Sequence, residues 1–198
     1  MSSPIKPTAP TEIDSYADPL RQRRYIAAMK RIATVRRPGP VRVYLSVAPR
    51  MRQAPAWDAR LADIRRHLPG VELLEYLDVF NDVHPYDWSQ VAGTLDGLII
   101  VAKAKRIGSN SHILGPYARG ELRSLVAHKP VLLHTYRHGL VPIIDCSSGL
   151  IGPEEKRKLR LTAPNCWKPD SPTLEAALAA LAPADSAAVA EPMELVRS

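Results

Sequence analysis

The chain has 198 residues, of which 45% are hydrophobic, and this is enough to bury one core and indicates a single domain with tails. No stretch approaches the roughly 18 consecutive apolar residues of a membrane span, and the first residues lack the apolar segment of a secretory signal. The two cysteines, Cys146 and Cys166, have no metal-binding spacing. These features argue against an integral membrane protein, a secreted protein and a metalloprotein. We expect a cytoplasmic protein with two thiols and with no metal or cofactor.

The positive charge is concentrated near the N-terminus. The formal net charge is +7, and residues 1–42 hold nine basic side chains against three acids, which accounts for +6 of it. The rest of the chain is almost neutral, so the domain itself lacks the charge pattern of a DNA-binding surface. Residues 1–15 are rich in proline and small polar residues, and we expect them to be disordered. Residues 1–40 are therefore predicted to form a basic arm, disordered at first and then helical.

The helix of this arm is predicted from Pro19 to about Val35, where apolar residues recur at helical spacing with arginines between them. The basic side chains of residues 20–42 could bind nucleic acid phosphate, an acidic partner or a neighbouring subunit. Alternatively, the helix packs its apolar stripe on the domain and leaves the arginines in water. We favour packing, because Tyr25 is the one aromatic residue among these arginines.

The core domain, residues 41–152, alternates strands and helices after the Pro-Gly-Pro at 38–40. Strands are predicted at 41–47, 71–77, 98–102, 131–134 and 141–144, and helices at 57–68, 87–95 and 116–127. This alternation predicts an α/β fold with a doubly wound parallel sheet of about five strands and helices on both faces. Residues 153–198 are predicted to be a C-terminal extension, with a charged run, a helix at 172–181 and a flexible tail rich in Ala, Pro and Ser.

One acid, Glu121, is placed near the start of the helix that follows the third strand, where α/β folds hold ligands and catalytic groups. The sequence has no Gly-x-x-x-x-Gly-Lys phosphate loop, no Gly-x-Gly-x-x-Gly fingerprint and no Gly-x-Ser-x-Gly nucleophile elbow. The candidate site is therefore a set of polar residues at strand ends: Tyr44 and Ser46 on the first strand, Asp96 before the third, and Glu121.

The order of three motifs resembles the nucleoside 2-deoxyribosyltransferase family over residues 41–135. The motifs are Tyr44-Leu-x-x-Ala-Pro49, then Asp96-Gly-Leu-Ile-Ile-Val101, then Gly120-Glu121-Leu122 followed by Lys129-Pro-Val131. The resemblance implies a flavodoxin-like fold and a homo-oligomer. It also implies cleavage or transfer at the N-glycosidic bond of a nucleoside, a nucleotide or a related compound.

By the same resemblance, Glu121 is the nucleophile that attacks the anomeric carbon and forms a covalent glycosyl–enzyme intermediate. Tyr44 orients that carboxylate by a hydrogen bond, and Asp96 helps to bind the sugar or handles the proton of the leaving base. A carboxylate suits this chemistry because it stabilises an oxocarbenium-like transition state and then bonds to it.

The other candidate binding residues come from strand ends and from the segment 103–114, which contains no acid. The expected substrate contacts are Ser46, Ser109, Asn110 and Gly115. The basic side chains of the segment favour a phosphorylated ligand, and the candidate phosphate-binding residues are Lys103, Lys105 and Arg106.

Each candidate residue also has a purely structural interpretation. Glu121 could complement the helix dipole in the first turn, Tyr44 could be a core aromatic residue, and Asp96 could be a turn residue before its strand. The basic segment could simply be solvated. For the whole protein, the alternatives to an enzyme are a non-catalytic nucleotide-binding or interaction module, and a nucleic-acid accessory protein that acts through the basic arm.

Overall fold

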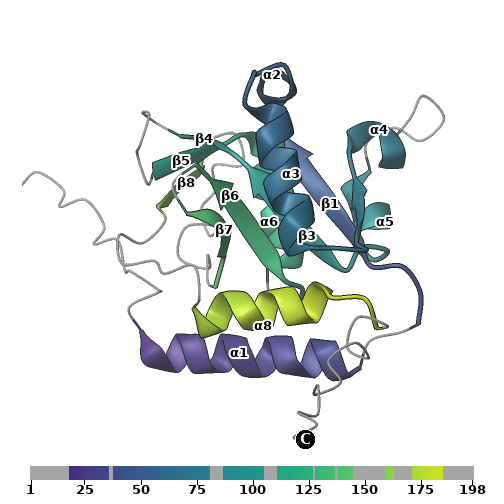
Figure 1. The fold of residues 1–198 in the computed structure, drawn as a ribbon, viewed down its shortest axis with the longest axis vertical. Helices are drawn as coiled ribbons and strands as arrows, with labels where there is room; N and C mark the ends of the chain where they lie inside the picture. Colours follow the sequence, from purple (N-terminus) through teal and green to yellow (C-terminus); the bar gives the residue numbers. More distant parts are fainter. Residues whose placement is uncertain are drawn as a thin grey trace, which may run out of the picture.

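Five strands form the central sheet of the computed structural model, in the order β2-β1-β3-β6-β7 (Figure 1). They are β1 (Arg42–Val47), β2 (Glu72–Leu74), β3 (Gly97–Val101), β6 (Val131–Thr135) and β7 (Gly139–Pro142). The structure describes residues 18–35, 38–80, 87–104, 111–126, 128–136, 138–144, 159–162 and 171–184. The predicted α/β fold with about five strands is confirmed, although the sheet is mostly parallel and not parallel throughout, and the strand order is consistent with a flavodoxin-like fold.

The edge strand β7 runs antiparallel to β6, whereas β2, β1, β3 and β6 are parallel to one another. The register between β6 and β7 pairs Thr135 with Gly139. So short a connection can join only antiparallel neighbours, since a parallel strand requires a crossover of a dozen or more residues. Gly139 has a φ of +62°, a left-handed conformation that glycine adopts readily.

The described helices cover both faces of this sheet. They are α1 (Pro19–Thr34), α2 (Pro49–Arg52), α3 (Trp57–His67), α4 (Tyr76–Val79), α5 (Trp88–Ala92), α6 (Pro116–Leu125) and α8 (Pro172–Leu181). In Figure 1, α3 lies in front of the sheet and α6 behind it. None of these helices is long and apolar enough to cross a membrane.

Two hydrophobic clusters lie on opposite faces of the sheet because successive residues of a strand point to opposite sides. Val43 and Leu45 of β1 belong to the cluster that also contains residues of α1, α3 and α8. Tyr44 belongs to the other cluster, with residues of α5 and α6. All five residues of β3 and all five of β6 are buried, as expected for parallel strands covered on both sides.

The predicted second strand is shorter than expected, because the chain turns into α4 after Leu74. Glu75 caps this helix: its side chain accepts a hydrogen bond from the backbone of Asp78, and its own N–H donates to the Asp78 carboxylate at 2.6 Å. This capping box satisfies backbone groups at the start of the helix and favours a helical turn over continuation of the strand.

A second, three-stranded antiparallel sheet was not predicted from the sequence. It consists of β4 (Lys103–Ala104), β5 (Ser111–Leu114) and β8 (Leu159–Thr162), in that order. The segment expected to be a basic loop therefore begins and ends in strands. β8 also begins at the end of the charged run of the C-terminal extension, where no strand was expected.

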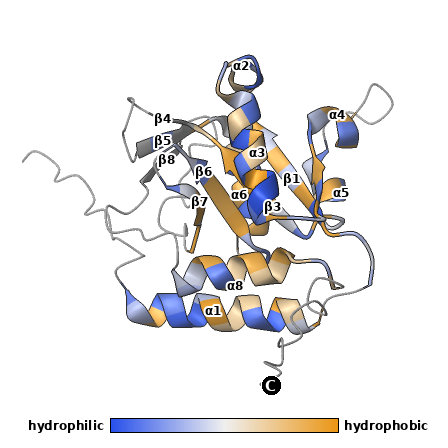
Figure 2. Ribbon diagram, viewed as in Figure 1, coloured by the Kyte–Doolittle hydropathy of each residue, from blue (hydrophilic) through white to orange (hydrophobic). Residues whose placement is uncertain are grey.

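Helices α1 and α8 lie side by side, although they come from opposite ends of the chain (Figure 1). Tyr25 and Met29 of α1 are buried in the same cluster as Leu174 and Ala177 of α8. Figure 2 shows hydrophilic and hydrophobic residues alternating along α1, and Arg23 is among its exposed side chains. The apolar stripe of the basic helix thus packs on the domain, while basic residues of the helix face solvent.

Gly97 at the start of β3 has no room for a side chain. A Cβ atom at this position would lie 2.7 Å from Leu181 Cδ2 and 3.0 Å from the carbonyl oxygen of Pro130. We expect Gly97→Ala to lower the free energy of unfolding by about 1–3 kcal/mol, because the Leu181 side chain must move and the methyl group crowds the Pro130 carbonyl oxygen. Gly93→Ala is the matched control, since a Cβ there meets no atom within 4 Å. Urea unfolding of both variants measures the difference, and equal losses would contradict the tight contact between β3 and α8.

Candidate functional site

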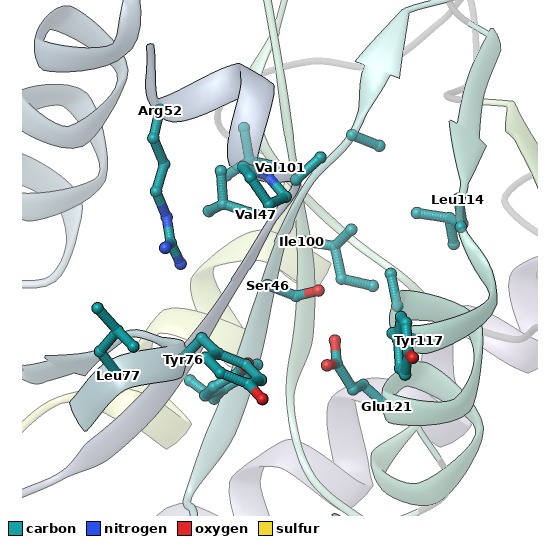
Figure 3. Close-up of a pocket in the computed structure, with 16 residues that line it drawn as sticks. Ser46, Val47, Arg52, Tyr76, Leu77, Ile100, Val101, Leu114, Tyr117 and Glu121 are labelled. Atoms are coloured by element: carbon teal, nitrogen blue, oxygen red, sulfur yellow. The ribbon is translucent and has the colours of Figure 1, made fainter. Parts of the chain in front are cut away.

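A cavity of about 620 Å³ lies at the carboxyl ends of β1 and β3 (Figure 3). Residues of α2, α4 and α6 complete its wall, and most of the lining is apolar. Ligands of open α/β sheets bind at this edge, and cavities of roughly 300–1,000 Å³ hold small molecules. The cavity is therefore the candidate functional site.

Glu121 lines this cavity and is only 3% exposed. It lies in the second turn of α6, whose first turn contains no acid, so the helix-dipole interpretation, which requires the first turn, does not fit. Tyr117 is one turn earlier on the same face, since residues i and i+4 of a helix are neighbours, and it also lines the cavity. A carboxylate that is buried against a ligand-sized cavity can meet a bound molecule directly, so its place favours a role in binding or chemistry.

Tyr44 and Ser46 reach the same cavity from β1, because residues two apart in a strand point to the same face. In Figure 3, the Ser46 hydroxyl and the Glu121 carboxylate point toward each other. The Tyr44 ring also packs edge-on against Trp88, with 5.1 Å between the ring centroids. Tyr44 is thus a core aromatic residue that lines the cavity, and its predicted hydrogen bond to Glu121 stays a prediction.

Asp96 does not join these residues, which corrects the expectation of a three-residue site. Its Oδ2 accepts a hydrogen bond from the Arg42 N–H at 2.9 Å, and its own N–H donates to the Arg42 carbonyl at 2.7 Å. These contacts lie at the amino end of β3, whereas the cavity lies at the carboxyl end. Five residues of strand separate the two ends by roughly 16 Å. An acid that immediately precedes a strand cannot reach the far edge, so the turn interpretation of Asp96 fits its contacts.

The remaining predicted binding residues divide in two. Gly115 lines the cavity, where it precedes the first turn of α6. Ser109, Asn110, Lys105 and Arg106 lie outside the described residues, and so does the side chain of Lys103. Their predicted contacts with substrate and phosphate stay predictions.

Three lining residues whose side chains carry polar groups were not predicted from the sequence: Arg52, Tyr76 and Tyr117. Tyr117 had a detectable signal, because it precedes Glu121 by four residues in a predicted helix. Arg52 and Tyr76 lie on α2 and α4, two single-turn helices that were not predicted. The pattern Glu75-x-x-Asp78 was the available signal for α4, since it is a capping-box spacing.

A second group of polar side chains lies on the opposite face of the sheet. His134 Nε2 is 3.0 Å from Asp63 Oδ2, and the Arg60 guanidinium carbon lies 3.4 Å from the centroid of the Tyr136 ring. Burial lowers the pKa of His134, and the nearby Arg60 charge lowers it too, although the bond to Asp63 opposes the shift. Burial also lowers the pKa of Arg60. Within the described part of the chain, no three His, Cys, Asp or Glu residues are placed to hold a metal ion.

Comparisons with protein-family models, with curated proteins and with solved structures give no match for this chain. The fold and the cavity define an α/β protein with a mostly parallel sheet and a cavity at its carboxyl edge. A fold of this class supports many unrelated functions, so the argument for function must come from the side chains in the cavity.

The lowered pKa of His134 predicts a pH dependence of stability. The unfolded chain takes up a proton near pH 6.5, whereas the folded protein resists it, so stability is full above about pH 6.5 and falls as the pH drops below it. The slope contributed by one such proton is at most about 1.4 kcal/mol per pH unit. We expect His134→Asn to flatten this slope, as measured by urea unfolding at several pH values. The exposed His128→Asn is the control, and an unchanged slope in His134→Asn would refute the assignment.

Proposed function

We propose that this chain is a nucleoside 2-deoxyribosyltransferase-like protein that cleaves or transfers at the N-glycosidic bond of a nucleoside, nucleotide or related compound. The observation that carries the proposal is the buried carboxylate of Glu121 in a largely apolar cavity at the carboxyl edge of the parallel sheet. The motif resemblance over residues 41–135 assigns the nucleophile to the same residue. We also propose that the sheet is doubly wound and flavodoxin-like. The strand order and the helices on both faces of the sheet support this.

In the proposed mechanism, a Glu121 carboxylate oxygen attacks the anomeric carbon while the bond to the base nitrogen breaks. The base leaves with the electron pair of that bond and takes up a proton from a water molecule, and a covalent glycosyl ester remains on Glu121. Water or a second base then attacks the same carbon, which releases the carboxylate. Tyr44 orients the carboxylate, and the apolar wall keeps bulk water away from the ester.

A second candidate function is a non-catalytic nucleotide-binding module with the same fold. The position of Asp96 favours it, because the leaving base needs a proton donor and the carboxylate expected to help lies at the other end of β3. Among the described lining residues, Glu121 is the one carboxylic acid. In this case the cavity binds its ligand without breaking the glycosidic bond.

Loss of the carboxylate should abolish base release. Wild-type protein and Glu121→Gln would be incubated with nucleosides, nucleotides and NAD, and free base measured by chromatography. We expect release to fall by at least about a thousandfold in Glu121→Gln, as is typical when a nucleophile is removed. The substitution is isosteric and removes a buried charge, so the thermal midpoint should be unchanged or raised.

Glu175→Gln on α8 is the matched control, because the same chemical change there affects an exposed side chain. Its rate of base release should equal that of the wild type. Equal base release by Glu121→Gln would eliminate Glu121 as the nucleophile. Ligand binding with no base release from any compound in the panel would favour the non-catalytic module.

The proposal also includes a homo-oligomer. Leu77 and Tyr117 line the mouth of the cavity and are 76% and 70% exposed, which is high for large apolar and aromatic side chains. A second copy of the chain packed over this mouth would cover them. Sedimentation equilibrium of the wild type should then show a mass above 21.8 kDa, and Leu77→Glu should reduce it.

A further inference from the structure

Arg52 brings a positive charge to the cavity. It is the last residue of α2, its side chain is about one quarter exposed, and it lines the cavity. In Figure 3, its guanidinium group extends from α2 toward Leu77 and Tyr76. Arg52 and Glu121 are the two charged residues among the described lining residues, and Figure 3 shows them on opposite sides of the cavity.

Glu75 holds the guanidinium group of Arg52 at one nitrogen. Arg52 Nε lies 2.9 Å from Glu75 Oε2. Glu75 is itself fixed, because its side chain and backbone form the capping box with Asp78 at the start of α4. Within the described part of the chain, the two terminal nitrogens of Arg52 make no ion pair or hydrogen bond. The contact with Glu75 is thus an ion pair without hydrogen-bond geometry at Nε, which keeps the guanidinium beside Glu75 and leaves its terminal N–H donors to a ligand.

The geometry of the two charges constrains the ligand. A guanidinium presents its terminal N–H groups as a planar fork, which fits the oxygens of a phosphate. An anionic group at Arg52 would be kept apart from the Glu121 carboxylate, which would repel it at close range. The apolar surface between them would then face the uncharged part of the ligand.

On the basis of the proposed function, we infer that Arg52 binds a phosphate group of the substrate and that Glu75 is its positioning residue. The substrate class is then a phosphorylated N-glycoside, such as a nucleoside 5′-monophosphate, in preference to the neutral nucleoside. This assigns phosphate recognition to a side chain on α2, separate from the basic segment that the sequence analysis singled out.

Calorimetric binding to the full chain tests the assignment. The probes are the four 2′-deoxynucleosides and their 5′-monophosphates. We expect the wild type to bind at least one monophosphate about tenfold or more tightly than its nucleoside, and raised salt to weaken this preference. Arg52→Gln should weaken monophosphate binding by about 10- to 100-fold, the effect of losing a hydrogen bond to a charged group, and leave nucleoside binding within about twofold.

Two further variants separate phosphate binding from general damage to the cavity. Arg50→Gln removes an exposed arginine of the same helix that does not line the cavity, and it should bind both probes like the wild type. Glu75→Gln keeps an oxygen that can cap α4 but loses the ion pair, so monophosphate affinity should fall partway while nucleoside affinity and the thermal midpoint hold. Equal weakening of both probes by Arg52→Gln would overturn the inference, and so would the absence of any preference for monophosphates in the wild type.

Base release would be measured in the same samples, so that failure of phosphate recognition and failure of cleavage can be told apart. Arg52-dependent binding of a monophosphate with no base release would support phosphate recognition and refute cleavage. Base release from nucleosides and monophosphates at equal rates, unaffected by Arg52→Gln, would support cleavage and refute phosphate recognition.

Discussion

The central constraint on this protein is that its parallel sheet is buried on both faces. Every residue of β3 and β6 is covered, with α1, α3 and α8 on one side and α5 and α6 on the other. Polar side chains have no place along such strands unless they are paired, so they gather where the strands end. The carboxyl edge is also where each strand passes into its next connection. The cavity, the buried carboxylate and the guanidinium all lie at this edge, where strand ends and the starts of helices bring their side chains together.

The central strands could be predicted from the sequence because their burial leaves a direct trace. Continuous apolar runs place β1, β3 and β6 within about one residue of their observed bounds. The short elements left no such trace. α2 and α4 are single turns, and β4 has two residues, so none is long enough to show a hydrophobic period. The antiparallel direction of β7 follows from its short connection to β6. The residues of β7 alone do not indicate this direction.

The site was predictable to the extent that chain order determines position at the sheet edge. Ser46 lies near the end of β1, and Glu121 lies in the helix α6, which begins at the same edge of the sheet. Both residues line the cavity. Asp96 shows the limit of motif matching: it lies next to a buried strand in sequence, but on the amino side, and its carboxylate pairs with the backbone of Arg42. Arg52 could not be predicted, because its contribution depends on Glu75, a residue 23 positions later that is brought close when β1 and β2 pair in parallel.

The contact between α1 and α8 means that α1 cannot complete its packing until α8 has been synthesised. α1 is made early, but the helix that it packs against ends at Leu181, so the apolar side of α1 has no partner until nearly the whole domain has emerged. The sheet can assemble in the meantime, yet one of its faces waits for both helices. Such a long-range closure slows folding and leaves apolar surface open to other proteins. The arginines of α1 then have a further effect: they keep an unpaired amphipathic helix hydrated and self-repelling while its partner is still being translated.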